Sequence, residues 1–410
     1  MLFRFALSSL KSRRKSVLLT FLSLLISISV LLSVEHIRSQ AEQSFSRTVS
    51  GVDLIVGAPS GQLNLLLYSV FRMGSPTNSI SYSSYDMLQN HAQVAWAVPI
   101  ALGDAHRGYR VLGTSPDYFT HFHYGNKQPL VFSSGGAFAQ PLEAVMGADV
   151  AKKLGYQVGD DIVISHGVGA VSFKNHDDAP FTITGILAPT GTPVDKTVHV
   201  SLQGIEAMHM PAKALRQYLS ASSETQLNLK PKQISAVLVG LNNKFATFSL
   251  QRQLNNYKGD RLMSILPGVA LAQLWQMMAS VENILMAISG LVMLSSLFGL
   301  STMLLASMQQ REQEIAVLRI LGASSLTLLM LIMVEALIIT LSACLASLLL
   351  TFGLFTLFSD TLANHYGLFI SANVLSPTSA VLLAGVVVAS LLTSLIPAID
   401  AYRNGLHARL

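Results

Sequence analysis

Four long stretches without Asp, Glu, Lys or Arg constrain the fold of this chain of 410 residues more than any other feature. They cover residues 16–34, 283–310, 336–359 and 361–399, which is 19, 28, 24 and 39 residues. A helix needs about 20 apolar residues to cross the hydrocarbon core of a bilayer. Charged residues make up only 12% of the chain, against about 25% in a soluble domain. We therefore expect a membrane protein with four transmembrane helices.

The limits of these helices follow from the polar residues around them. The third crossing begins before its charge-free stretch and so contains Glu335. The fourth stretch is too long for one crossing, and its polar first part predicts a loop over residues 359–376. The expected transmembrane helices cover residues 16–34, 281–308, 324–358 and 377–399.

Basic residues predict the orientation. They gather in three short segments: 1–15 (Arg4, Lys11, Arg13, Arg14, Lys15), 309–323 (Arg311, Arg319) and 400–410 (Arg403, Arg409). Basic residues in short loops stay in the cytoplasm, whereas a long domain is translocated regardless of its charge. Both termini and the segment 309–323 are thus expected inside, and residues 35–280 outside. A cleaved signal peptide is the alternative at the amino terminus, but the apolar run is 19 residues long and no small-x-small cleavage site follows it.

The external segment 35–280 mixes strand-like and helical patterns, which predicts an α+β domain of two lobes. Strands are expected at residues 52–56, 97–102, 109–115, 160–165, 181–188, 197–202 and 234–241, and helices at 142–156 and 211–220. Helical periodicity also continues from the first crossing to about Ser46, and a second helix of 40 residues begins at Val269. Forty residues span about 60 Å, twice the hydrocarbon thickness of ~30 Å. We expect both helices to leave the bilayer as stalks that carry the domain.

The charged segment 309–323 is predicted to form a short helix at the membrane surface. Arg311, Ile315 and Leu318 follow one another at i, i+4 and i+7, and Gly322 is placed as a carboxyl-terminal cap. Composition alone also fits a simple linker beside the membrane.

This segment resembles a known family. "REQEIAVLRILGAS" is similar to the "RR.EI..LRA.GA" segment of the MacB/FtsX superfamily of ABC transporter permeases, the type VII ABC transporters. The end of the chain, "IPAIDAYRNGLHARL", resembles that family's "PA..A.R..P..AL", with a departure at Leu406 where the family usually has a nearby proline. The sequence resemblance lies mainly in residues 280–410, and the expected topology extends it over the full length.

The resemblance implies a permease subunit of the bacterial inner membrane that binds no cofactor itself. The segment would be a coupling helix in a groove of a cytoplasmic ATPase dimer, and the permease would be a homodimer with a periplasmic or outer-membrane partner protein. ATP would be hydrolysed by the ATPase chain, since the sequence lacks the phosphate-binding motif G-x-x-x-x-G-K-[ST]. An FtsX-like regulator of a periplasmic enzyme, which transports nothing, is the alternative. The implied coupling residues are Arg311, Glu312, Glu314, Ile315, Leu318, Arg319 and Gly322.

Histidines in the external segment are candidate ligands of a metal site. Stretches such as "GDAHRGYRVLGTSPDYF" resemble a branch of permeases of this superfamily that is linked to metal handling in Gram-negative bacteria, so a zinc-linked transport system is another alternative. Neutral imidazole together with carboxylate suits zinc. The candidate ligands are His106, His166, His176 and His199. No pair has a tight metal spacing, which favours ordinary surface or hydrogen-bonding roles.

Glu335 is the expected polar site inside the membrane. It lies about nine residues, or roughly 14 Å, into the third crossing. A carboxylate there costs about 2.5 to 3.5 kcal/mol on insertion scales, so it marks a functional position. We expect helix–helix hydrogen bonding in preference to proton relay.

Other function classes are disfavoured. The sequence contains neither H-E-x-x-H nor G-x-S-x-G, which argues against a membrane hydrolase. The net charge of +5 comes mostly from the basic cytoplasmic segments and gives no pattern for nucleic acid. Cys344 is the only cysteine, so no disulfide can form within the chain.

Overall fold

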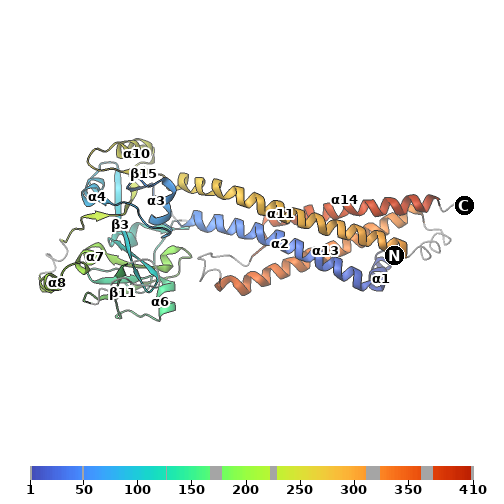
Figure 1. Ribbon diagram of the computed structural model, residues 1–410, viewed down its shortest axis with the longest axis horizontal. Helices are drawn as coiled ribbons and strands as arrows, with labels where there is room; N and C mark the ends of the chain where they lie inside the picture. Colours follow the sequence, from blue (N-terminus) through green and yellow to red (C-terminus); the bar gives the residue numbers. More distant parts are fainter. Residues whose placement is uncertain are drawn as a thin grey trace. The chain divides into compact units, whose positions relative to one another are not determined.

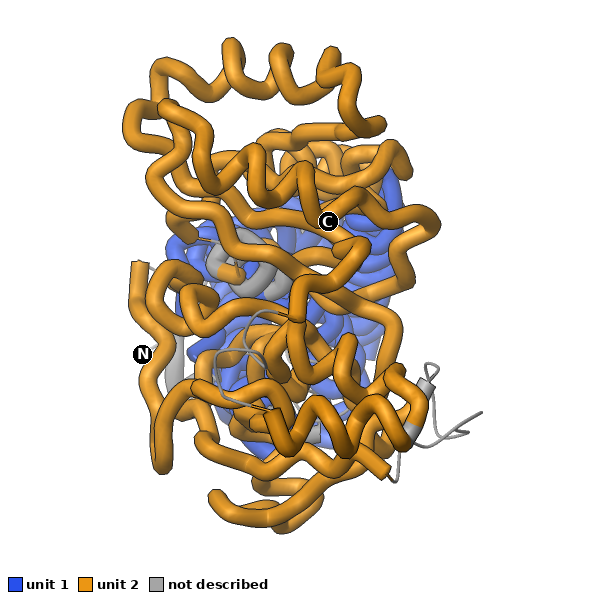
Figure 2. The backbone as a smooth tube through the Cα atoms, turned by 90° about the vertical axis from the view of Figure 1, so that its left-hand side faces the viewer, with its two compact units in different colours: residues 1–41, 278–410 blue, residues 42–277 orange. Residues whose placement is uncertain are grey.

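The chain divides into two compact units, each described by itself. The computed structural model describes residues 2–48, 50–125, 127–166, 178–221, 229–310, 324–361 and 373–407. The first unit, called the membrane unit below, is Met1–Ala41 with Met278–Leu410, and the second, called the external unit, is Glu42–Met277 (Figure 2).

The described part of the membrane unit is built from long helices (Figure 1). They are α1 (Leu2–Ser12), α2 (Arg14–Arg47), α11 (Pro267–Gln310), α13 (Ser325–Thr361) and α14 (Pro377–His407), of which α2 and α11 continue into the external unit. Four of them have a segment long and apolar enough to cross a membrane: Arg14–Gln40, Pro267–Gln310, Ser325–Phe358 and Pro377–Asp400. The expected count and order of four membrane helices, one before the external domain and three after it, is confirmed.

Apolar side chains both fill and cover the membrane unit. Leu24 and Ile28 of α2, Leu300 of α11 and Ala343 of α13 are fully buried in one core. Large apolar side chains are also exposed on the outside of the helices, among them Leu19 (70% exposed), Leu349 (65%) and Val381 (71%). Water would disfavour such a surface, whereas lipid or another apolar helix matches it.

Several serine hydroxyls inside this unit donate hydrogen bonds to their own helices. Ser347 donates to the Cys344 carbonyl and Ser390 donates to the Val387 carbonyl, both at 2.8 Å. In hydrocarbon an unbonded hydroxyl would be costly, and a bond to the preceding turn removes that cost. These small residues let α13 and α14 pack closely.

Over its described residues, the external unit contains a mixed sheet of eleven strands. Its main path runs in the order β15-β1-β14-β3-β4-β12-β8-β11-β7, with β10 paired to β3 and β9 paired to β11. The strands of this sheet are β1 (Leu54–Gly57), β3 (Val94–His106), β4 (Tyr109–Thr114), β7 (Phe132–Gly135), β8 (Glu143–Met146), β9 (Asp161–Ile162), β10 (Ser165–His166), β11 (Phe181–Leu187), β12 (Thr197–Ser201), β14 (Ala236–Leu241) and β15 (Met263–Ile265). Two small ladders pair β2 (Ile80–Ser81) with β13 (Gln233–Ile234) and β5 (His123–Tyr124) with β6 (Gln128–Pro129).

Strand β3 joins the two halves of the sheet. Its first part pairs with β14, up to Ile100 against Ala236, and its second part pairs with β4, from Ala101 against Gly113. The register shifts between Leu102 and Ala105, which marks a bulge. A bulge bends a strand and increases its twist. The core around Tyr118 contains Ile100 of β3 and Val145 of β8, so it extends over both halves of the sheet. The core around Phe181 contains Ala144 and Met146, which alternate with Val145 along β8 and therefore lie on the other face.

Short helices complete the external unit. They are α3 (Gln62–Ser69), α4 (Tyr82–Gln89), α5 (Asp117–His121), α6 (Ala148–Leu154), α7 (Leu202–Met208), α8 (Ala212–Leu219) and α10 (Thr247–Asn255), with 3-10 turns η1 (Pro193–Lys196) and η2 (Lys244–Ala246). Serine and threonine start two of them: Ser201 accepts from the Gly204 amide and Thr192 from the Val194 amide. Such bonds satisfy amide groups that the first helical turn leaves unpaired.

Two sequence expectations for this unit were wrong in part. The strand expected at residues 160–165 is two short strands, β9 and β10, which pair with β11 and β3 respectively. Residues 142–156 were expected as one helix, but residues 143–146 form β8 and only residues 148–154 form α6. Strand β8 lies between β11 and β12 in the sheet, and its residues Ala144, Val145 and Met146 are fully buried. Burial on both faces of a central strand therefore overrides the helical preference of alanine and methionine.

Candidate functional site

The first polar site of the membrane unit joins α1 to α13 through Glu335. The Ser9 hydroxyl of α1 donates a hydrogen bond to Glu335 Oε1. The Arg13 guanidinium lies 3.4 Å from Glu335 Oε2 and donates to Ser9 Oγ at 2.7 Å. Glu335 is 2% exposed. The carboxylate is thus held by a cation and a hydroxyl from the amino-terminal end of the chain, in a contact between helices.

Local geometry explains why Arg13 reaches this position. Helix α1 ends at Ser12 and α2 begins at Arg14, so Arg13 occupies the break between them. Its amide donates to the Leu10 carbonyl at 3.3 Å, which closes a tight turn. The turn leaves Ser9 and Arg13 on the face of α1 that also buries Ala6 and Leu10.

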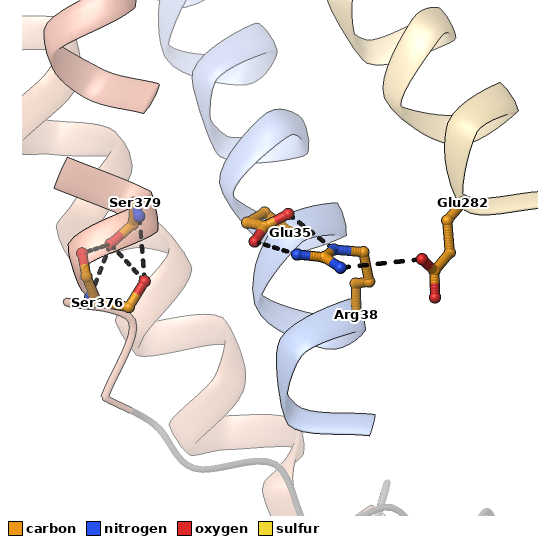
Figure 3. A network of polar contacts seen from close by, with 5 residues as sticks. All are labelled: Glu35, Arg38, Glu282, Ser376 and Ser379. Carbon is orange, nitrogen blue, oxygen red and sulfur yellow. Dashed lines mark hydrogen bonds and ion pairs between the residues drawn. The ribbon is translucent and has the colours of Figure 1, made fainter. Parts of the chain in front are cut away.

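The second polar site links α2 to α11 at the other end of the membrane unit (Figure 3). Arg38 donates two bonds to the Glu35 carboxylate, at 3.0 and 2.9 Å, and its Nη1 lies 3.9 Å from Glu282 of α11. Glu35 is 5% exposed at its side chain, whereas Glu282 is 24% exposed. The fork of Arg38 therefore bridges the carboxylates of the two helices.

Hydroxyls add a third link between the same two helices. Ser27 of α2 lies 2.6 Å from Ser296 of α11, oxygen to oxygen, and Ser23 lies 3.0 Å from Ser296. At the start of α14, Ser376 and Ser379 cap the helix by mutual bonds, such as the Ser376 amide to Ser379 Oγ at 2.8 Å (Figure 3). Helices α2 and α11 are therefore held together by polar contacts at several levels.

In the external unit, the same two helices attach to neighbouring strands. After α2 ends at Arg47 the chain enters β1, and β15 leads into α11 across a single residue, Leu266. Strands β1 and β15 pair directly, with Ile55 opposite Ile265. The first turns of α11 also bury Ala270 and Leu271 in the core around Tyr118. Helix α11 thus follows almost directly from β15, the edge strand of the sheet, whereas residues 48–53 separate α2 from β1.

The proposed metal ligands are separated by their surroundings. His106, at the end of β3, has Nδ1 at 2.7 Å from the Val163 carbonyl and Nε2 at 2.9 Å from the Tyr156 hydroxyl. His199, in the middle of β12, is fully buried, and its ring lies tilted against that of Tyr118 with the centroids 5.3 Å apart. The backbone of His166 pairs with Asp104, and His176 lies outside the described residues. Among the residues that the structure describes, no group of three or more His, Cys, Asp or Glu is placed to hold a metal.

His199 belongs to a buried polar cluster that the sequence did not reveal. Its Nδ1 lies 3.3 Å from the Val145 carbonyl. Arg72, 9% exposed and with a left-handed backbone (φ 59°), donates to the Tyr118 hydroxyl at 3.2 Å and to the Ser69 carbonyl. Burial, with the Arg72 charge as a second cause, lowers the pKa of His199 to about 3. His199 is therefore neutral in the folded protein at any ordinary pH.

This shift predicts that acid destabilises the external unit. An unfolded histidine has a pKa of about 6.5, so between pH 6.5 and 3 the unfolded chain binds a proton that folded His199 refuses. The stability that the neutral form provides is complete above pH 6.5 and falls by about 1.4 kcal/mol per pH unit below it, or about 2.7 kcal/mol at pH 4.5. We expect His199→Phe to flatten this slope in thermal unfolding of the full chain. The exposed His209→Asn should keep it, and an unchanged slope in His199→Phe would contradict the assignment.

The expected ATPase-coupling residues, Arg311, Glu312, Glu314, Ile315, Leu318, Arg319 and Gly322, lie outside the described residues. Sequence reasoning identified Glu335 but missed Ser9, Arg13 and the contact of Arg38 with Glu282. The contact of Arg38 with Glu282 could have been predicted from the sequence. Glu35, Arg38 and Glu282 each stand close to an apolar run, at ends that are expected on the same side of the membrane. Ser9 and Arg13 could not be predicted in this way, because the basic residues before the first crossing indicated only how the chain is oriented in the membrane.

Two family models match this chain. A family model described as "MacB-like periplasmic core domain" matches residues 17–257, and a model described as "FtsX-like permease C-terminal" matches residues 286–406. Among solved structures, the chain is similar to the crystal structure of the periplasmic region of MacB from Actinobacillus actinomycetemcomitans, with 10% identity and a TM-score of 0.36 over 56% of this chain and 94% of that one. A search of curated proteins finds no match. The first family model alone covers more than half of the chain, and the chain therefore belongs to the MacB/FtsX-like family of permeases.

Proposed function

We propose that this chain is the permease subunit of an ABC system that carries ATP-driven movement from a cytoplasmic ATPase to the external unit. Permeases of this family generally work with such an ATPase and form oligomers. The observation that supports the proposal best is the attachment of α2 and α11 to the paired strands β1 and β15. Two helices that cross the membrane and end on one strand pair are suited to transmit a push or a twist.

The polar contacts between the helices support transmission in preference to a pore. Arg38 with Glu282, and Ser27 with Ser296, tie α2 to α11. A tied pair moves as one lever, whereas a solute path would need polar groups that face a cavity. In this proposal the protein stands in the inner membrane of a bacterium with the external unit in the periplasm. There it moves a substrate or acts on a periplasmic or outer-membrane partner.

We propose a homodimer as the working form. Exposed apolar side chains lie along both helices, including Ile26 (57% exposed) on α2 and Ile284 (60%) and Leu291 (66%) on α11. A second copy would cover part of this surface and bring two coupling segments to two ATPase chains. A zinc-linked role for the system stays a proposal that rests on the resemblance of the amino half alone.

The coupling segment gives the direct test. A buried leucine contributes about 1.5 to 3 kcal/mol to an interface, whereas an exposed ion pair contributes about 0 to 1 kcal/mol. We therefore expect Leu318→Asp to reduce co-purification of the ATPase and its stimulated hydrolysis far more than Glu314→Gln does. Membrane insertion and dimer formation should be unchanged in both variants. Normal ATPase association in Leu318→Asp would reduce residues 311–322 to a surface linker and contradict the proposed coupling to an ATPase.

A further inference from the structure

Helix α1 has two different faces, and only one of them is used by the contact with α13. One face buries Ala6, Ser9 and Leu10. The opposite face exposes Lys11, and Leu7 there is 46% exposed. Leu7 and Lys11 are four residues apart on the helix, so they lie on the same side. This face pairs an apolar side chain with a cation.

The exposed face continues into the start of α2 as a patch of positive charge. Arg14 and Lys15 follow the break at Arg13 and are both exposed. Arg13 itself is bonded to Ser9 and lies against Glu335. The described ion pairs of the membrane unit are those of Arg13 and Arg38, and none of them includes Lys11, Arg14 or Lys15. Lys11, Arg14 and Lys15 are thus three exposed cations within a few residues of the break between α1 and α2, and no ion pair of the described residues includes them.

We propose that Leu7, Lys11, Arg14 and Lys15 form a binding site for an anionic phospholipid of the cytoplasmic leaflet. The three cations hold the headgroup phosphate and Leu7 contacts an acyl chain. The proposal rests on the orientation that the proposed function assumes, with α1 on the cytoplasmic side of the membrane. It does not need the ATPase.

The neighbouring side chains favour a lipid over a free phosphate ion. A soluble phosphate needs only donors, and an exposed leucine beside it contributes nothing. Long basic side chains that lie over an apolar surface and reach toward headgroups are typical of helices at the membrane interface. The apolar run of α2 begins immediately after Lys15, at Ser16, so the patch stands at the level where headgroups end and acyl chains begin.

Occupation of this site would also act on the contact with Glu335. The lipid would hold one face of α1 while Ser9 and Arg13 hold the other face against α13. Helix α1 would then be fixed between the bilayer and the helix that follows the coupling segment. Lipid composition would in this way favour one position of α13.

Native mass spectrometry of the delipidated full chain tests the site with phosphatidylglycerol and phosphatidylcholine as probes. We expect preferential binding of phosphatidylglycerol, and an affinity about a hundredfold lower in the variant Lys11→Gln/Arg14→Gln/Lys15→Gln, since each cation near the surface is worth about fivefold. The variant keeps Arg13 and Glu335, and its helix content is checked by circular dichroism. The matched control Lys152→Gln/Lys213→Gln/Lys258→Gln removes three exposed lysines of the external unit and should bind the lipid normally.

Three outcomes would overturn the proposal. Equal binding of both lipids would show that no anionic site exists. Unchanged phosphatidylglycerol binding in the triple variant would place the lipid elsewhere. Displacement of the lipid by inorganic phosphate at equal concentration would assign the patch to a soluble anion. Loss of ATPase association in Leu318→Asp has no bearing on any of these results, so failure of the lipid site and failure of the ABC function can be told apart.

Discussion

Replacing Glu335 by leucine should detach α1 from α13. Arg13 and Ser9 would lose their carboxylate partner, and Arg13 would remain largely buried without a counter-charge. Removal of one member of a buried ion pair costs about 3 to 5 kcal/mol. Hydrogen exchange of the α1 amides should therefore become faster by a factor of about 150 to several thousand.

A double-mutant cycle separates the pair from the change of shape. Arg13→Met alone leaves Glu335 buried with Ser9 and should cost a similar amount, whereas Arg13→Met/Glu335→Leu replaces both charges by apolar groups and should recover most of the protection. The control Glu282→Gln changes a carboxylate that is 24% exposed and stands 3.9 Å from its arginine. It should leave α1 unaffected. Additive effects in the cycle would show that Glu335 and Arg13 do not interact.

The role of Glu335 shows how far sequence could lead. A carboxylate inside an apolar helix is conspicuous, and its cost requires a polar partner. The partner itself could not be read from the pattern, because Ser9 and Arg13 stand more than 320 residues away in the chain. Four other basic residues near the first crossing were equally good candidates by composition. Only the break between α1 and α2 selects Arg13.

The membrane helices were predictable because their signal is local. Length and absence of charge decide whether a segment crosses a bilayer, and each of the four spans carries that signal by itself. The error at residues 142–156 has the opposite cause. Strand β8 is defined by its neighbours β11 and β12, which follow it by about 35 and 50 residues, so its own sequence carried little information.

The histidines illustrate a limit of counting residue types. His106 and His199 stand in the same sheet, yet His106 is bonded to Tyr156 and Val163, while His199 is enclosed by aromatic rings. Sequence spacing could not distinguish these surroundings. Alternation places a strand residue on one face or the other, but the identity of its neighbours depends on strand order.

The largest effect in the external unit is expected from Leu271→Ala. Leu271 is 8% exposed, and together with Ala270 it anchors the first turns of α11 in the core around Tyr118. Truncation of a buried leucine costs about 2 to 5 kcal/mol. Val269, two residues earlier, is 47% exposed, and Val269→Ala should change stability by less than about 0.5 kcal/mol. The rate of hydrogen exchange of the β1 and β15 amides should therefore increase by a factor between about thirty and several thousand in Leu271→Ala. In Val269→Ala it should stay near its normal value.

The same pair of variants tests whether α11 works as a lever. With the anchor loosened, ATP hydrolysis by the associated ATPase should continue, because the coupling segment is unchanged. The exchange pattern of the external unit should then no longer differ between the nucleotide-free and the ATP-bound complex, whereas Val269→Ala should keep that difference. If Leu271→Ala loosens β15 and the external unit still responds fully to ATP, the movement reaches the sheet through α2 and β1 alone. The paired attachment of both helices would then have no mechanical role.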